Sequence, residues 1–186
     1  MRLIIFGPHG SGKGTQAKLI SKHYKIPVID TGEILRKNIE KNTELGKKVK
    51  KYLDENKYVP DEIMNPLVEE MLNKDECKKG FILDGYPRTV EQAKFLDNLL
   101  SKLNIELNAV INLQVPDDEL VKRLTRRGRE EDTKEGIKSR MDEYETKAEP
   151  VLDYYRDEGK VVDINGDQIV EKVFKDIRQE LDRLVG

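Results

Sequence analysis

The sequence predicts an α/β protein whose parallel sheet is covered by helices on both faces. Five short apolar runs, several of them rich in β-branched residues, are typical of buried strands and too short for helices. Longer segments with apolar residues three and four positions apart lie between these runs. Because strands that alternate with helices pair in parallel, this order indicates a parallel sheet with a helical layer on each side. The five runs occupy residues 3–6, 26–29, 81–83, 109–113 and 161–164.

The elements follow one another regularly, with two interruptions. Residues 3–6 end at Gly7 and lead into a segment at 16–24 that is compatible with a helix. Residues 31–60 contain several helical patterns without a strand, and residues 126–133 form an arginine-rich turn. Such insertions into an α/β scaffold often carry substrate specificity. A further helix is expected over 89–103, whose apolar stripe consists of Val90, Ala93, Leu96, Leu99, Leu100 and Leu103.

Length and composition favour one cytoplasmic domain. The chain has 186 residues, and its 34 Lys and Arg against 36 Asp and Glu give a net charge of −2. This balance argues against binding to nucleic acid by bulk electrostatics. The apolar run at 3–6 is too short to span a membrane, and no signal-peptide region precedes it. The single cysteine, Cys77, excludes an internal disulfide and a cysteine-clustered zinc site. We expect a soluble protein that binds neither nucleic acid nor membranes and is a monomer by default.

A glycine-rich loop directly follows the first predicted strand. Residues 7–13 have the spacing G-x-x-x-x-G-K before a helix-compatible segment. Glycines let the backbone curl around an anion, the helix N-terminus adds partial positive charge, and Lys13 would reach the β- and γ-phosphates. A serine or threonine that ligates Mg²⁺ often follows this lysine, but here Gly14 does, and Thr15 comes one position later.

An acidic residue closes the third predicted strand. Asp84 follows the apolar run at 81–83, where a carboxylate usually meets the hydration shell of Mg²⁺. We therefore expect phosphate oxygens and water to hold the metal, with Asp84 as an outer-shell acceptor. Taken alone, Asp84 is also compatible with a helix N-cap or a turn.

Arginines that follow two of the predicted strands indicate a second phosphate site. Arg36 lies one helical turn beyond the second strand, and Arg88 follows the third. Arg88 comes shortly after the third strand and is a natural phosphate partner, and the Tyr86-Pro87 bond is a candidate cis peptide that would aim it inward. Thr31, after the second strand, is equally compatible with a helix N-cap.

A basic segment lies further along the chain. Residues 122–140 contain eight basic and four acidic residues, in which Arg123 and Arg127 share a helix face and Gly128 marks a helix break. A plain charged helix face is the simpler interpretation of such a segment taken alone. Beside the phosphate loop, the same arginines could neutralise a transferring phosphoryl group.

Together these motifs resemble the adenylate kinase family. The resemblance is carried by residues 7–15, 30–33, 59–62, 81–88, Gln92, Arg127, Arg129, Asp132, Arg140 and 149–155. It implies a three-layer P-loop kinase fold with a five-stranded parallel sheet, in one domain over 1–186. The core would be 1–29, 61–125 and 134–186, with a helical AMP-binding insertion at 30–60 and a minimal lid at 126–133. It also implies reversible transfer of the terminal phosphoryl group from Mg·ATP to AMP, giving two ADP.

The resemblance also assigns roles to individual residues. ATP would be bound by Gly10, Ser11, Gly12, Lys13, Gly14, Thr15, Arg123 (stacked on the base), Arg127 and the backbone at Gly166. AMP would be bound by Thr31, Arg36, Lys57, Tyr58, Val59, Gly85, Tyr86, Pro87, Arg88, Gln92, Arg129 and Arg140, with Gln92 on the adenine edge. Lys13, Arg88, Arg127, Arg129 and Arg140 would stabilise the transferred group. Only Gly128 separates Arg127 from Arg129, which is similar to the short-lid, zinc-free form, and Glu33 stands where aspartate is common.

Two alternative functions share features of this sequence. A UMP or CMP kinase on the same scaffold is the nearest alternative, although Thr31 and Gln92 favour AMP. A GTPase needs the guanine-reading pattern Asn-Lys-x-Asp, and the nearest string, at 73–76, ends in Glu76 instead. His9, inside the phosphate loop, is interpreted as a variable loop residue rather than a catalytic one, since no pairing group lies nearby in the sequence.

Overall fold

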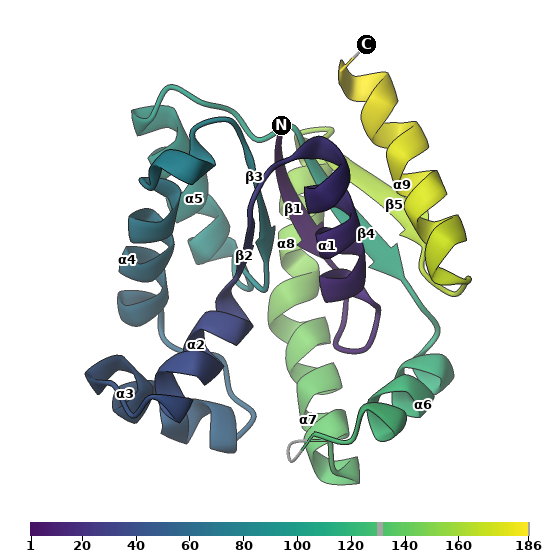
Figure 1. Ribbon diagram of the computed structural model, residues 1–186. Coiled ribbons are helices and arrows are strands. Elements are labelled where there is room, and N and C mark those ends of the chain that lie inside the picture. Colours follow the sequence, from purple (N-terminus) through teal and green to yellow (C-terminus); the bar gives the residue numbers. More distant parts are fainter. Residues whose placement is uncertain (130–131, 186) are drawn as a thin grey trace.

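A parallel five-stranded sheet forms the centre of the molecule (Figure 1). The computed structural model describes residues 1–129 and 132–185. The strands lie in the order β2-β3-β1-β4-β5 and all neighbours pair in parallel. This confirms the predicted sheet. The strands are β1 (Arg2–Phe6), β2 (Val28–Asp30), β3 (Phe81–Asp84), β4 (Ala109–Gln114) and β5 (Val161–Asn165).

Helices cover both faces of this sheet. Leu3 and Ile5 of β1 pack toward α1 (Lys13–Tyr24) and α9 (Val170–Val185), in one apolar cluster. Ile4 and Phe6 belong to a second cluster with α4 (Asp61–Leu72), α5 (Val90–Lys102) and α8 (Glu149–Asp157). Successive residues of a strand point to opposite faces, so β1 contributes to both clusters. The α/β three-layer prediction is confirmed.

Two helical arms extend beyond the carboxyl ends of the strands (Figure 1). The helices α2 (Thr31–Glu40) and α3 (Glu44–Asp54) form one arm, at the lower left of the view. The helices α6 (Asp117–Arg127) and α7 (Lys134–Glu143) form the other, with α6 at the lower right and α7 at the bottom, near the centre. A π-helical segment η2 (Tyr144–Ala148) joins α7 to α8, and a short 3₁₀ turn η1 (Asp75–Cys77) precedes β3.

These arms match the interruptions predicted at 31–60 and 126–133. Residues 130 and 131 of the expected lid, and residue 186 at the end of the expected core, lie outside the described residues. The division into core, AMP-binding insertion and lid stays a prediction.

Three local expectations were wrong in detail. The second strand begins at Val28 rather than at residue 26, because Pro27 has no amide hydrogen for the sheet. The first helix begins at Lys13 rather than at residue 16, directly after Gly12 in a left-handed conformation. The N-cap of α2 is Asp30, whose carboxylate accepts from the Glu33 amide at 2.8 Å, so Thr31 is not the cap.

In the part of the chain that the structure describes, no helix combines the length and the apolar character that crossing a membrane requires.

Candidate active site

The register of the sheet brings the predicted motifs to one edge. Ile5 of β1 is aligned with Asp84 of β3, and Asp30 of β2 is aligned with the same residue. On the other side, Gln114 of β4 pairs with Asn165 of β5. The segments that follow these strands therefore meet at the carboxyl ends, where open parallel sheets bind their ligands.

The loop between β1 and α1 has the conformation of a phosphate-binding loop. Gly7, Gly10 and Gly12 have φ angles of 138°, 89° and 96°, which glycine adopts without strain. A Cβ atom at Gly7 would lie 2.8 Å from the carbonyl oxygen of Leu113, so a larger residue does not fit. No side chain of the described residues caps α1, so amides of its first turn are available to an anion.

Lys13 lies across this loop. Its Nζ donates to the carbonyl oxygens of Gly7 at 2.7 Å and Pro8 at 2.9 Å. Desolvation of the ammonium group lowers the pKa of Lys13 to about 8, although the nearby carboxylate of Asp84 acts in the opposite direction. A bound phosphate would compensate this desolvation, so the lysine is placed to exchange its carbonyl partners for phosphate oxygens.

Asp84 faces the same loop from the end of β3. The residue is 6% exposed, and its Oδ2 would lie 3.7 Å from a Cβ atom at Gly14. Burial raises the pKa of Asp84, and the charge of Lys13 opposes this shift. No hydrogen-bond donor to this carboxylate is found among the described residues. The N-cap of α5 is Thr89, so the alternative of a cap role for Asp84 is wrong.

This carboxylate fits the predicted magnesium site. Magnesium prefers oxygen ligands and keeps several waters, and a buried carboxylate without a protein donor can accept hydrogen bonds from such waters. Within residues 1–129 and 132–185, no group of three or more His, Cys, Asp or Glu side chains could hold a metal by itself. The expectation of a zinc-free protein stays a prediction.

Arg88 is held beside the phosphate loop from three directions. The Tyr86-Pro87 peptide is cis, as expected. The Nε of Arg88 donates to the carbonyl oxygen of Gly85 at 2.9 Å, and its Nη1 lies 3.2 Å from Nε2 of His9. Its guanidinium carbon lies 4.8 Å from the ring centroid of Tyr58, a cation–π contact. Its charge is thus fixed near the loop, with uncharged partners.

A cavity of about 580 Å³ opens beside Arg88. Most of the residues predicted to bind AMP line this cavity. Among the predicted residues that do not line it, Tyr86 and Pro87 line a small adjoining pocket together with Lys13. Arg129 lies in the turn between α6 and α7, where its amide donates to Asp132. The predicted residues that line the large cavity are Thr31, Arg36, Lys57, Tyr58, Val59, Gly85, Arg88, Gln92 and Arg140.

Gln92 joins two elements at the wall of this cavity. Its Oε1 accepts from the Arg88 amide at 2.8 Å, and its Nε2 donates to Asp61 Oδ1 at 2.7 Å. The residue is 2% exposed. Both ends of the amide are therefore partnered within the protein, and contact with a base would require one of these bonds to be shared or exchanged. Its role on adenine stays a prediction.

Thr31 lies beside the strand end that carries Asp84. Its hydroxyl donates to the carbonyl oxygen of Asp84 at 3.2 Å. This bond fixes the start of α2 against β3. A Cβ atom at Gly85 would lie 2.7 Å from the Thr31 hydroxyl oxygen, so only glycine lets the two segments approach this closely.

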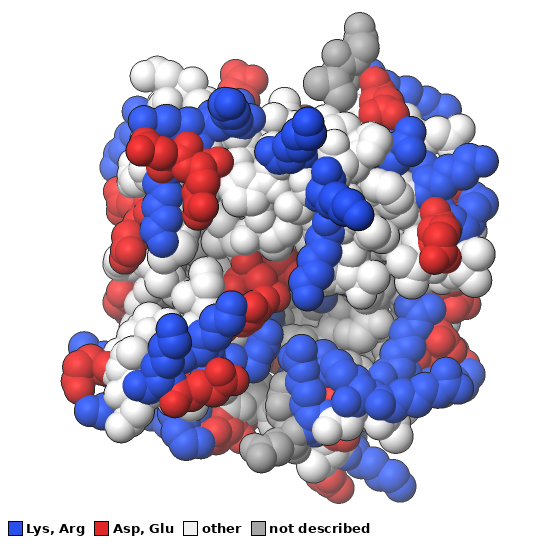
Figure 2. Space-filling view, viewed as in Figure 1, with Lys and Arg blue, Asp and Glu red and all other residues white. Residues whose placement is uncertain are grey.

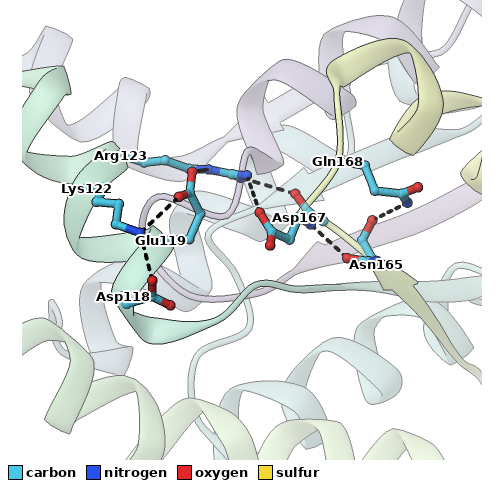
Figure 3. Close-up of polar contacts among 8 residues, drawn as sticks. Asp118, Glu119, Lys122, Arg123, Asn165, Asp167 and Gln168 are labelled. Atoms are coloured by element: carbon cyan, nitrogen blue, oxygen red, sulfur yellow. Dashed lines mark hydrogen bonds and ion pairs between the residues drawn. The ribbon is translucent and has the colours of Figure 1, made fainter.

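Arg123 and Gly166, both predicted to contact the donor base, are brought together. Figure 3 shows Arg123 beside Asp167 in the loop after β5. Arg123 Nη1 donates to the carbonyl oxygen of Gly166 at 3.1 Å, and Nη2 lies 3.3 Å from Asp167 Oδ1. Its Nε pairs with Glu119 at 2.9 Å along α6. These contacts hold the plane of the guanidinium beside the loop after β5. Stacking on a base stays a prediction.

Asp132 binds the arginines of the opposite arm. Its side chain is 1% exposed and accepts from Arg127 through two bonds, at 2.8 and 2.7 Å. Arg140 Nη2 donates to the same carboxylate at 2.7 Å, and the Arg129 amide at 3.1 Å. Burial alone would raise the pKa of Asp132, but the bonds from Arg127 and Arg140 outweigh it and hold this pKa well below its usual value.

Positive charge flanks the hollow between the two arms. Figure 2 shows many Lys and Arg side chains over the α2–α3 arm and over the α6–α7 arm, on either side of the hollowed lower centre. Such a distribution attracts anions into the space between the arms.

Sequence reasoning missed several contacts of this site. Asp132 belongs to the family pattern but had no predicted role, and no contact with the ligands was predicted for Asp61 or His9. The sequence contains one indication for Asp61, because residues 59–62 belong to the family pattern. His9 had none, because its partner Arg88 is 79 positions away in the chain.

Comparison with known proteins agrees with this geometry. A family model described as adenylate kinase matches residues 5–160. A protein named adenylate kinase from Leptospira biflexa is 46% identical, over 97% of this chain and 99% of its own. Another from Archaeoglobus fulgidus is 41% identical, over 99% of both chains. That alignment spans 215 positions against 186 residues here, so this chain lacks at least 29 residues that the longer relative has.

The fold and these matches define a P-loop phosphotransferase. The chain belongs to the adenylate kinase family. The resemblance stated from its motifs is thereby confirmed, and the comparisons give no support to the UMP or CMP kinase alternative.

Proposed function

We propose that the protein transfers the terminal phosphoryl group of ATP to AMP, reversibly, giving two molecules of ADP. The observation that carries this proposal is the position of Arg88. It lies between the phosphate loop of β1–α1 and the cavity lined by Thr31, Gln92 and their neighbours. Two phosphate-bearing ligands bound in these places would meet end to end.

Catalysis in this arrangement rests on positioning and on charge. The loop amides and Lys13 would hold the donor phosphates, and Arg88 would hold the acceptor phosphate. Arg127, Arg129 and Arg140 would approach from the α6–α7 arm and meet the charge that spreads over the transferred group. No covalent nucleophile is needed, because fixing the two reactants supplies much of the rate enhancement.

Magnesium would be bound by phosphate oxygens and by water molecules, and these waters would donate hydrogen bonds to the carboxylate of Asp84. When bound, the ion would neutralise charge on the donor phosphates. Asp84 would orient the hydrated ion, and the transfer itself would remain between the two nucleotides.

The lining of the cavity supports AMP as the acceptor. Thr31 and Gln92 provide hydroxyl and amide groups at a wall lined elsewhere by the apolar side chains of Leu35, Val59 and Met64. An adenine ring would fill such a space, and a pyrimidine is smaller. The donor side, with Arg123 and a backbone carbonyl, has few groups that distinguish bases, so we expect moderate breadth among triphosphates.

The decisive experiment is a coupled assay of ADP formation over a panel of donors and acceptors. We expect rapid turnover with ATP and AMP, little turnover with UMP or CMP, and activity with other triphosphates within about tenfold of ATP. Equal hydrolysis of ATP with and without AMP would contradict the proposal. A bis-adenosine compound with five bridging phosphates should inhibit by occupying both pockets, and its failure to bind would also contradict it.

A further inference from the structure

His9 occupies an unusual place in the phosphate loop. It lines the small pocket beside Lys13 and Arg88, and it also lines the large acceptor cavity. The loop that is expected to bind the donor thus contributes a side chain to the acceptor side. The nearest polar contact of its imidazole is with Arg88, where Nε2 lies 3.2 Å from Nη1.

The chemistry of this contact fixes the state of the ring. A guanidinium has only donors, so Nε2 must be the acceptor and must carry no proton. The proton of the neutral ring is then on Nδ1. A doubly protonated ring has two donors and no acceptor, and it could not make this bond.

The surroundings favour the same state. The groups that act on the ring are Lys13 from α1, Arg88 after β3, Arg127 from α6 and Arg140 from α7. Tyr58 and Tyr144 line the same small pocket. Desolvation first, and then these four positive charges, hold the pKa of His9 well below 6.5. The ring is therefore neutral at neutral pH.

We propose that His9 is a positioning residue of the acceptor site, whose neutral imidazole accepts a hydrogen bond from Arg88 and fixes that guanidinium toward the acceptor phosphate. Gly85 holds Nε, His9 holds Nη1, and the Tyr58 side chain also contacts the guanidinium. These three partners are uncharged, so the positive charge of Arg88 stays available to a phosphate. A long side chain that is already held loses less conformational entropy when it binds.

The inference rests on the proposed function, since it takes AMP as the ligand of Arg88. A packing role for His9 is the competing interpretation. The two differ in what a side chain of similar size without an acceptor would do, and in the tautomer of the ring.

The first test is the ring spectrum of the free protein. The chain has two histidines, His9 and His23, so ¹⁵N–¹H spectra contain two imidazole systems, and His23→Gln assigns them. At about pH 7 we expect the His9 proton on Nδ1 and an unprotonated Nε2. A proton on Nε2, or a doubly protonated ring, would overturn the proposal. This measurement needs neither substrate nor activity.

The second test is a pair of variants at one position. His9→Leu keeps a side chain of similar size without an acceptor, whereas His9→Gln can place an amide oxygen near the position of Nε2. We expect the Leu variant to raise KM for AMP by roughly tenfold, and KM for ATP by less than about twofold, as loss of a bond to a charged group predicts. The Gln variant should recover most of the affinity for AMP. His23→Gln, at an exposed position, is the matched control.

The outcomes separate the proposals. Equal effects of Leu and Gln, or equal rises in both KM values, would show packing and overturn the positioning role. In an Arg88→Lys background, His9→Leu should add little, because the guanidinium it positions is gone. If the wild-type protein forms no ADP from ATP and AMP, the proposed function fails, while the ring spectrum still decides the contact with Arg88.

Discussion

The arginines on the two sides of the phosphate loop are held in different ways. On the acceptor side, Arg88 contacts the Gly85 carbonyl, the His9 ring and the Tyr58 ring, all of which are uncharged. On the opposite arm, Arg127 and Arg140 are bound to the carboxylate of Asp132. The first arrangement orients a charge without neutralising it, whereas the second pairs charges before any ligand arrives.

This difference has a physical reason in burial. Arg140 is 6% exposed, and a buried guanidinium without a counter-charge is strongly unfavourable. Asp132 removes that penalty in the absence of ligand. A phosphate that approaches Arg127 or Arg140 must therefore compete with Asp132 or share its arginines, while one that approaches Arg88 meets an oriented donor.

The largest expected effect comes from Lys13 in the phosphate loop. Lys13→Met removes the ammonium that faces the donor phosphates, and we expect kcat to fall on the order of 10³-fold, as for loss of a transition-state donor. Steady-state formation of ADP measures it. Lys18→Met, at an exposed position of α1, is the control and should keep normal activity. A fall of less than tenfold would mean that Lys13 is not the main cation.

Asp132→Asn breaks the pairing on the α6–α7 arm. The variant leaves two guanidinium groups facing an uncharged amide, and we expect a loss of about 3 kcal/mol in the free energy of unfolding, or roughly 10 °C in Tm. Thermal unfolding measures it. The control is Asp118→Asn, whose exposed pair with Lys122 is screened by solvent, so this variant should leave the unfolding transition nearly unchanged. Equal shifts in the two variants would contradict the role of Asp132.

The same carboxylate predicts that the free energy of unfolding decreases at acid pH. The pKa of Asp132 in the folded protein lies below its usual value of 3.8, so the folded state binds its proton less readily than the unfolded state. The stabilisation by ionised Asp132 is therefore complete well above pH 3.8. It is lost as the pH falls from 3.8 toward the lower pKa of the folded state. Urea unfolding across this range should show a steeper loss in the wild type than in Asp132→Asn, and parallel curves would refute the linkage.

These contacts also show what could be predicted from the sequence. The strands, the phosphate loop and the ends where Asp84 and Arg88 lie follow from short apolar runs and from glycine spacing, which are local patterns. The bonds from Arg127 and Arg140 to Asp132 join residues 5 and 8 positions apart across a turn, and no local pattern indicates which carboxylate the arginines choose.

The contacts at the wall of the acceptor cavity depend even more on tertiary structure. Gln92 reaches Asp61 across 31 positions, and His9 reaches Arg88 across 79. Both pairs form because parallel strands bring their carboxyl ends together, which the sequence predicts in general but not side chain by side chain. The same holds for the cap of α2, where Asp30 and Thr31 are both good N-cap residues and the backbone decides between them.

A smaller effect is expected from Gln92 at the wall of the acceptor cavity. Gln92→Ala removes the bonds to Arg88 and Asp61 together with the proposed contact to the base, so part of the loss should be common to all acceptors. We expect kcat/KM for AMP to fall about tenfold more than that for UMP.

Asp61→Asn sharpens this test, because it perturbs the same network from the other end while the amide of Gln92 remains. Asp61→Asn should lower kcat/KM for AMP and kcat/KM for UMP by similar factors. Equal losses on AMP and UMP in Gln92→Ala itself would remove the base-recognition role and leave Gln92 as a support of Arg88.

The smallest effect concerns pH and distinguishes the two sides once more. Lys13 has a pKa of about 8 in the free protein, because desolvation disfavours its ammonium form. If only that form binds the donor phosphates, the affinity for ATP should be constant below about pH 7 and fall as the pH rises, becoming about fourfold weaker at about pH 8.5. Lys13→Arg should bind with no such dependence, since a guanidinium does not lose its proton in this range. Calorimetric titration with ATP measures both, and a flat profile in the wild type would show that the lysine keeps its proton through contacts that the free protein already provides. AMP binding, which rests on Arg88, should lack this alkaline loss, so the pH dependence is expected on the donor side alone.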